Sequence, residues 1–149
     1  MRFPVGAGAK GSSGVSAALI RASGGIGYVD TAYSIRNGLA YAALQNRAGS
    51  FELPTTAAVA AAAQAAQNIP PDNAISIVDP PASAAQAYPL STFTYALVPE
   101  RTAKADLLKP FLSYALSDGQ SFGAPLEFAT LPQKIVAVDW KTIRRIKRS

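Results

Sequence analysis

The sequence predicts an α/β fold, because two kinds of pattern alternate along its 149 residues. Segments with apolar residues at helical spacing follow capping residues or proline, and short runs of β-branched and aromatic residues lie between them, bounded by glycine, proline or asparagine. The composition supports a folded chain, since 49% of the residues are hydrophobic and only 15% are charged. That balance is too apolar for intrinsic disorder.

The first 50 residues predict two short helices and two strands. Ser12, Ser13 or Gly14 is expected to cap a helix over residues 15–20, which the glycines at 24–25 end. Ile26, Gly27 and Tyr28 then suit a short, closely packed strand, and Asp30 or Thr31 opens a second helix that ends near residues 37–38. Residues 39–44 predict another strand, followed by a turn at 46–50 and an extended segment at 51–53.

The middle of the chain predicts one helix and one strand. Alanine dominates residues 57–67, and alanine loses no rotamer entropy in a helix, so a helix is expected there after the threonines at 55–56. Three prolines between residues 79 and 89 predict a crossing segment between two lobes. Residues 91–98 are the best strand candidate in the chain, being rich in aromatic and β-branched residues.

The last third predicts two helices. One spans about residues 102–116, with Leu107, Leu108, Phe111, Leu112 and Ala115 forming an apolar stripe that should pack on a sheet. Pro110 lacks an N–H, so a break or a shifted start is expected near Lys109. A loop over residues 118–123 and a last helix after Pro132 complete the chain.

The positive charge is concentrated in the C-terminal tail. The net charge is +5, and five of the 14 basic residues lie in the last nine positions, namely Lys141, Arg144, Arg145, Lys147 and Arg148. We interpret these as solvated cations that complement a helix C-terminus, with contact to anionic lipid or nucleic acid as the alternative. No nucleic-acid partner is expected. The chain has no cysteine or histidine, which excludes disulfides and the usual zinc ligands, and we expect no metal site and no cofactor.

The candidate binding residues are Lys10, Gly11, Ser12, Ser13 and Gly14. Glycines and a lysine invite a phosphate-loop interpretation, but Lys10 is followed by glycine, and neither the P-loop nor the dinucleotide pattern is met. A flexible loop or helix entry is therefore the default. The other possibility is that these residues line a cleft at a helix N-terminus and add a positive field to an anion held mainly elsewhere.

Other polar and aromatic residues have structural interpretations. Ser91, Thr92 and Thr94 suit a sheet or hinge, and the tyrosines at 28, 33 and 41 suit packing. Asp30 and Asp79 follow predicted strands but have no neighbouring carboxylate, so cap or turn roles are expected. No nucleophile has a base beside it, and we predict that the chain is not an enzyme and has no catalytic residue.

The order KGSSGV…ASGGIGYVDTAYSIRNGLAYAAL resembles the later half of the phosphate-binding protein of ABC-type phosphate uptake systems. The likeness continues through residues 88–92 and 131–132 to Trp140. It implies a partial periplasmic-binding-protein type II fold, with pieces of two α/β lobes, residues 1–87 in lobe two and residues 88–149 returning to lobe one. The family's main anion ligands lie upstream of the matching region, so the resemblance implies a C-terminal fragment that binds phosphate weakly or not at all by itself.

The same resemblance implies partners and a location. In the full-length family the ligand is phosphate and the partner is an ABC permease, outside the cytoplasm, in the periplasm or at the cell surface. The N-terminal residues contain no apolar run of export-signal length. Incomplete lobes would expose strand edges, which favours self-association or an upstream fragment as partner. The alternative is a small interaction protein that uses exposed sheet edges or the basic tail, and another oxyanion such as molybdate or sulfate ranks lower than phosphate.

Overall fold

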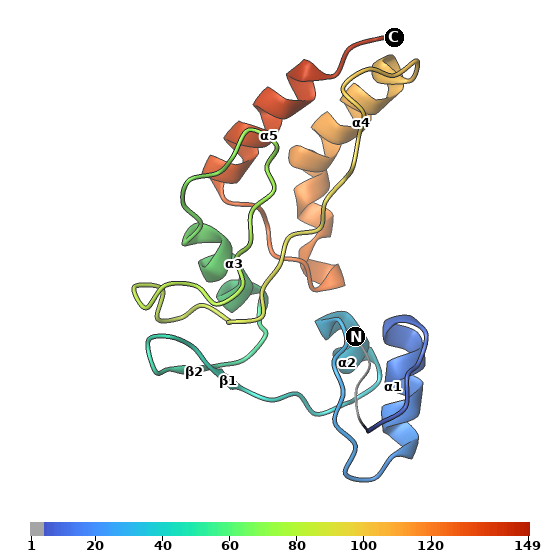
Figure 1. Cartoon of the computed structure of the whole chain (residues 1–149), viewed down its shortest axis with the longest axis vertical. Helices are drawn as coiled ribbons and strands as arrows, with labels where there is room; N and C mark the ends of the chain where they lie inside the picture. Colours follow the sequence, from blue (N-terminus) through green and yellow to red (C-terminus); the bar gives the residue numbers. More distant parts are fainter. Residues whose placement is uncertain (1–4) are drawn as a thin grey trace. The chain divides into compact units, whose positions relative to one another are not determined.

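The computed structural model describes residues 5–149 and forms two compact units (Figure 1). Unit 1 ends at Ala42, and unit 2 comprises Ala43–Ser149. Within the described part, no helix has both the length and the apolar character needed to cross a membrane.

Unit 1 is built from two packed helices, α1 (Gly11–Arg21) and α2 (Thr31–Arg36). Both were predicted, and Asp30 occupies the N-cap position of α2, although its side chain makes no cap hydrogen bond. The predicted cap of α1 is wrong, since the N-cap residue is Lys10, which makes no side-chain cap bond. The helix begins earlier because Gly11 (φ +66°) makes the turn into it. A turn with Gly24 (φ +74°) follows α1 and lets the chain reverse.

The predicted strand at residues 26–29 does not form. Ile26 is 99% exposed and Tyr28 is 82% exposed. Among the described residues, no neighbouring strand supplies a backbone hydrogen-bonding partner, which a strand requires. The expected close packing at Gly27 is nevertheless present. A Cβ atom there would lie 3.1 Å from Leu19 Cδ1 and 3.2 Å from Val15 Cγ1, so only glycine lets this segment approach α1 freely.

Ser16 lies at the buried face of α1, with 1% of its surface exposed. Within the described residues, its Oγ has no hydrogen-bond partner. A buried hydroxyl without a partner costs free energy that an alanine at the same place avoids.

We therefore expect Ser16→Ala to raise the free energy of unfolding of unit 1 by about 1 kcal/mol. Thermal unfolding followed by circular dichroism measures the change. Ser13→Ala is the matched control, because Ser13 is exposed on the same helix and shares only the gain in helix propensity. A loss of stability in Ser16→Ala would mean that the hydroxyl has a partner and would contradict this explanation.

Unit 2 starts with a short hairpin of strands β1 (Leu44–Gln45) and β2 (Phe51–Glu52). The strands are antiparallel, with Leu44 opposite Glu52. Only the last residue of the strand predicted at 39–44 is paired, whereas the turn at 46–50 and the extended segment after it formed as predicted.

Asn46 is a buried polar side chain of unit 2 that makes four hydrogen bonds to the backbone. Its Nδ2 donates to the carbonyl oxygens of Ala85 (2.8 Å) and Ala87 (3.1 Å). Its Oδ1 accepts from the backbone N–H groups of Ala48 (3.0 Å) and Ser50 (3.1 Å). One side chain thus ties the hairpin turn to a loop about 40 residues later.

Helix α3 (Thr56–Gln64) carries the apolar core of unit 2. Thr55 caps it by accepting from the Ala58 N–H at 3.1 Å, and the helix begins at the threonines, as predicted. The buried core residues are Ala62, Ala63, Ile77 and Ala87, with Phe93 packed beside them. Alanine on this face lets the loop chain approach the helix closely, as the Tyr88 N–H bond to Ala58 O (3.1 Å) shows.

The best predicted strand, residues 91–98, is irregular in the structure. Within the described residues, no backbone–backbone hydrogen bond involves this segment. It is held by side chains instead: Phe93 joins the core, and the Tyr95 hydroxyl donates to Ile75 O at 2.6 Å. A strand needs a second strand beside it, and within residues 5–149 none is paired with this segment.

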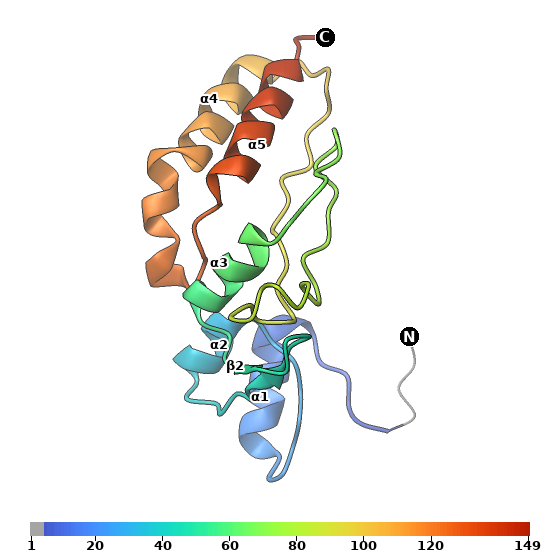
Figure 2. The same ribbon diagram turned by 90° about the vertical axis from the view of Figure 1, so that its left-hand side faces the viewer.

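Helices α4 (Ala105–Leu116) and α5 (Gln133–Arg145) pack side by side (Figures 1 and 2). The predicted break at Pro110 is wrong, because α4 continues through it. Pro110 removes one hydrogen bond, to Asp106 O, and both residues are exposed, so water can reach that carbonyl. The stripe of α4 packs on α5 rather than on a sheet, and it leaves Leu107 and Phe111 exposed.

The segment between these helices is more regular than predicted. Residues 118–123, expected as a loop, contain the 3₁₀ helix η1 (Asp118–Phe122), and a second 3₁₀ helix, η2 (Ala124–Leu126), follows it. Gln120 holds this segment in place: its Nε2 donates to Ala115 O at 2.7 Å, and its Oε1 accepts from the Leu131 N–H at 2.9 Å.

Hydrogen bonds from polar side chains hold α5 against the end of α3 and the segment that follows it. Lys134 Nζ donates to the carbonyl oxygens of Gln64 and Ala66 at the end of α3, where free carbonyls favour a cation. The Asp139 carboxylate accepts from Asn73 Nδ2. Burial raises the pKa of Asp139, and the bond from Asn73 partly offsets the rise. These contacts stabilise the last helix predicted from the sequence.

Candidate functional site

The predicted binding residues form the first turn of α1 in unit 1. The Gly14 N–H donates to Lys10 O at 3.3 Å, which places the start of the helix at this point. Lys10 and Ser13 are exposed, and Ser12 is half-buried. The N–H groups of Gly11, Ser12 and Ser13, which precede Gly14, have no intrahelical acceptor, so the turn carries a partial positive charge.

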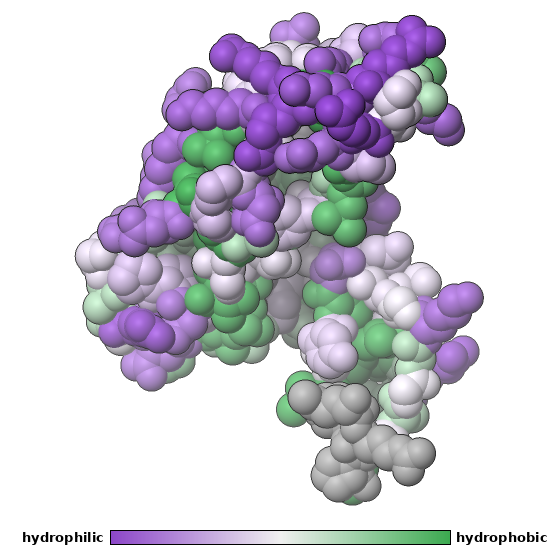
Figure 3. Space-filling view, turned by 45° about the horizontal axis from the view of Figure 1, so that its top comes forward, coloured by the Kyte–Doolittle hydropathy of each residue, from purple (hydrophilic) through white to green (hydrophobic). Residues whose placement is uncertain are grey.

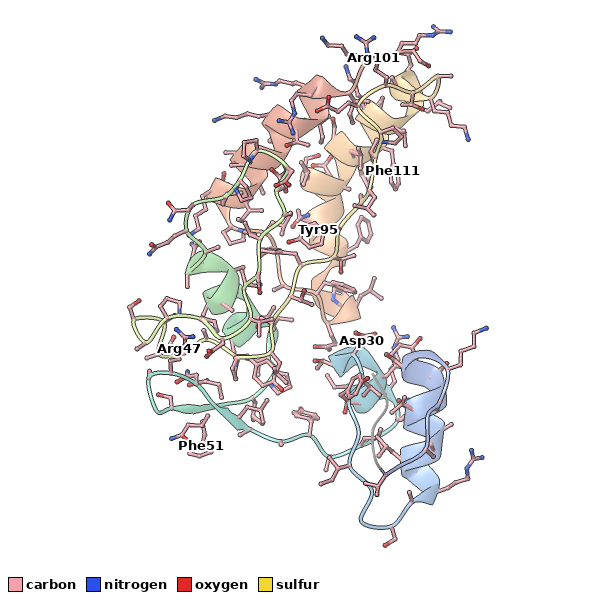
Figure 4. All side chains as sticks on the ribbon, viewed as in Figure 1. Asp30, Arg47, Phe51, Tyr95, Arg101 and Phe111 are labelled. Carbon is pink, nitrogen blue, oxygen red and sulfur yellow. The ribbon has the colours of Figure 1, made fainter. Side chains whose placement is uncertain are left out.

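Ser12 is engaged by Asp30, a contact that the sequence did not predict. Its Oγ donates to Asp30 Oδ2 at 2.9 Å and accepts from the Asp30 N–H at 3.4 Å. Asp30 is marked in Figure 4. The carboxylate therefore lies beside the first turn of α1, where it already uses part of the positive field and repels a second anion.

The glycine-rich loop before α1 does not have the geometry of a nucleotide cradle. Such a loop joins a strand to a helix, and no strand precedes α1 within residues 5–10. The loop is exposed throughout, as expected for a helix entry.

The hydroxyl residues after the proline-rich segment have mainly structural surroundings. Ser91 is buried and donates to Tyr88 O at 2.8 Å. Thr92 and Thr94 are exposed. Of the tyrosines considered above, Tyr28 and Tyr41 are exposed and Tyr33 is half-buried in α2.

Asp79 is a turn residue with an ion-pair partner. Its φ of +55° is rare for a residue with a side chain, and its N–H donates to Pro89 O at 2.8 Å. Asp79 Oδ2 lies 2.7 Å from Arg47 Nη2 and 2.8 Å from Arg47 Nε. Arg47, labelled in Figure 4, was predicted only as part of a turn, because a partner 32 residues away leaves no local signal.

Two hollows of about 300 Å³ flank α3 in unit 2. One is lined by alanine, proline, isoleucine and valine, with Gln67, Ser76, Asp79 and Ser83 as polar neighbours. The other has Gln64 and Thr130. Neither hollow has a lysine or arginine among its lining residues, so neither is suited to an anion. The described residues also contain no group of carboxylates able to hold a metal ion.

Comparisons with known proteins agree with the resemblance drawn from the sequence. The phosphate-binding protein PstS of Xylella fastidiosa (strain Temecula1) is 33% identical over 141 residues, which cover 91% of this chain and 38% of that protein. PstS of Pasteurella multocida is 29% identical, over 95% of this chain and 43% of its own length. PstS of Methanocaldococcus jannaschii is also 29% identical, over 95% of this chain and 40% of that protein.

The chain thus spans about two-fifths of the length of these curated relatives. A family model described as the PBP superfamily domain matches residues 4–119. The match covers most of unit 1 and a large part of unit 2, including the candidate residues at the start of α1. The chain belongs to the PBP superfamily, and within it resembles the PstS phosphate-binding proteins.

Proposed function

We propose that this chain is part of the phosphate-binding component of an ABC-type phosphate transporter. The main support for this proposal is that the similarity to phosphate-binding proteins extends over 91% to 95% of the chain. In this role the whole protein captures phosphate in the periplasm or at the cell surface and delivers it to an ABC permease. The role is one of binding rather than catalysis.

The proposal includes an architecture of two type II lobes, with the chain passing between them near residues 87–88. The segment 79–89 supports this position, because it is rich in prolines and turns and contains no helix or strand. Residues 10–14 would line the cleft of the whole protein, where the start of α1 adds positive field to an anion held mainly by other groups.

By itself, the chain is proposed to bind phosphate weakly or not at all. Lys10 is the one basic residue in the candidate stretch, and Ser12 is already bonded to the Asp30 carboxylate. A helix terminus contributes at most about 2 kcal/mol, whereas a micromolar site needs about 8 kcal/mol. The missing donors would come from the part of the protein that this chain does not span, or from an associated polypeptide.

Isothermal titration of the monodisperse chain with phosphate tests the weak-binding proposal, with sulfate as the control anion. We expect no saturable heat with either anion. A micromolar or tighter dissociation constant for phosphate would overturn this part of the proposal, and Lys10→Glu would then show whether the first turn of α1 is the site.

A chimera tests the family function separately. The part of the Xylella protein that aligns with this chain, 38% of its length, is replaced by the aligned part of this chain, and phosphate binding by the folded product is compared with sulfate binding. Selective phosphate binding is expected. A chimera that gives a native-like circular dichroism spectrum but no phosphate heat would overturn the proposed function, and one that fails to fold would overturn the proposed lobe architecture.

A further inference from the structure

The structure gathers seven basic residues at one end of unit 2, two of them far from the C-terminal tail in sequence. This basic cluster consists of exposed residues, namely Arg101, Lys104, Lys141, Arg144, Arg145, Lys147 and Arg148. Arg145 is the least free of those with an ion pair, because its side chain is 44% exposed and its Nη2 donates to Pro71 O at 2.6 Å. Figure 3 shows strongly hydrophilic side chains gathered at the top of the view, and Figure 4 shows basic side chains around Arg101, which belongs to unit 2.

Backbone contacts, rather than chance proximity, bring the two parts of the basic cluster together. Arg101 and Lys147 form a parallel β-bridge. The Thr102 N–H donates to Lys147 O at 3.0 Å, and the Lys147 N–H donates to Glu100 O at 2.6 Å. Ile146, between the tail cations, is buried and anchors the tail against this end of the unit. The tail is therefore a fixed part of the surface rather than a free extension.

The basic cluster has few carboxylates to neutralise it. Glu100 Oε1 lies 3.7 Å from Arg145 Nε, and Asp106 Oδ2 lies 3.4 Å from Arg148 Nη1. Both pairs are largely exposed, so water and salt weaken them. Seven cations against two carboxylates leave five positive charges, which equals the +5 of the whole chain.

Large apolar side chains border the basic cluster on α4. Leu107 is 74% exposed and lies one turn from Lys104, and Phe111, one turn further, is 65% exposed. Residues spaced by three and four positions lie on the same helix face, so cation, leucine and phenylalanine follow each other along one side of α4. Leu97, four residues before Arg101, is 94% exposed.

We propose that this end of unit 2 docks on an anionic lipid bilayer surface. Anionic lipid headgroups would neutralise the basic cluster. Leu107 and Phe111 would leave water and enter the boundary between the headgroups and the acyl chains, which is favourable for apolar side chains. Nucleic acid offers the same phosphate charge, but its backbone would leave these apolar side chains in water. The combination of charge and exposed apolar residues therefore favours lipid.

Co-sedimentation of the full chain with phosphatidylcholine vesicles, with and without phosphatidylserine, tests the proposal at low and high salt. We expect the chain to bind the anionic vesicles at low salt and to be released at high salt. Each basic residue close to the membrane surface raises the membrane affinity about fivefold, and salt screens this attraction. The double variant Lys141→Glu/Arg144→Glu should lower affinity at least tenfold. Neither residue makes an ion pair within the described residues, so the fold should persist.

Arg21→Glu/Arg36→Glu is the matched control, because it changes the net charge equally at exposed positions of unit 1. If both double variants lost the same vesicle affinity, the net charge alone would explain the binding, and the proposal would be overturned. Leu107→Ser should weaken vesicle binding severalfold without changing binding to duplex DNA. Equal binding to neutral and anionic vesicles, or binding to DNA at a salt concentration where vesicles are not bound, would also overturn it.

Discussion

Asn46→Ala is expected to lower the free energy of unfolding of unit 2 by about 3 kcal/mol, because it removes four hydrogen bonds at once. Two carbonyls and two N–H groups lose their partner in a place where Asn46 itself is only 7% exposed. The hairpin turn and the loop at residues 85–87 then have no shared side chain to hold them together.

The fluorescence of Trp140 during urea unfolding measures this loss, since it is the one tryptophan of the chain and lies in unit 2. Asn37→Ala is the matched control. Asn37 is exposed, belongs to unit 1, and donates one side-chain bond, to Tyr33 O at 2.8 Å. An Asn46→Ala midpoint within error of the wild-type value would refute the central role of this side chain.

Asn46→Asp separates the two halves of the interaction. Aspartate keeps an oxygen for the N–H groups of Ala48 and Ser50 but places a second oxygen against the carbonyls of Ala85 and Ala87. We expect a loss at neutral pH at least as large as that of alanine, because a buried charge faces two carbonyl oxygens without a donor. Stability should partly recover at acidic pH, where a protonated carboxyl can donate one bond.

Gly119→Ala should destabilise unit 2 by about 2 kcal/mol. A Cβ atom at Gly119 would lie 2.8 Å from Tyr114 O, which is closer than such atoms approach each other. Tyr114 O cannot move easily, because it accepts from the Ser117 N–H (3.1 Å) at the end of α4. The alanine therefore forces the backbone between α4 and η1 to shift.

Urea unfolding monitored at Trp140 again gives the size of the effect. Gly8→Ala is the control, because a Cβ atom there would meet nothing within 4 Å and its φ is not in the left-handed region. If Gly119→Ala were as stable as Gly8→Ala, the close approach of η1 to the end of α4 would be wrong.

The helices of this chain were predictable because their signals are local. An apolar spacing, a threonine at position 55 and a proline at position 132 lie beside the elements that they define, and each helix forms its own hydrogen bonds. Two predicted strands failed for the opposite reason, and of a third, at residues 39–44, only the last residue is paired. Residues 26–29 and 91–98 have strand-like sequences, but a strand is completed by another segment's N–H and C=O groups, which its own sequence does not encode.

In the candidate site, too, features set by neighbouring residues were predictable and contacts between distant residues were not. The position of residues 10–14 at a helix start follows from local spacing, although the N-cap is Lys10 rather than a serine. The bond between Ser12 and Asp30, the ion pair between Arg47 and Asp79, and the bridge between Arg101 and Lys147 join residues 18, 32 and 46 positions apart. No single-sequence pattern indicates such pairs.

Segment 91–98, which has no strand partner, also bears on the tendency of this chain to form fibrils at high protein concentration. Its eight residues carry no charge and no proline, and their sequence, STFTYALV, has the β-branched and aromatic content of a segment that stacks in cross-β fibrils. In a sheet, flanking strands would occupy its N–H and C=O groups; here only side chains restrain it. Fibril nucleation and the packing of Phe93 into the core therefore compete for the same residues.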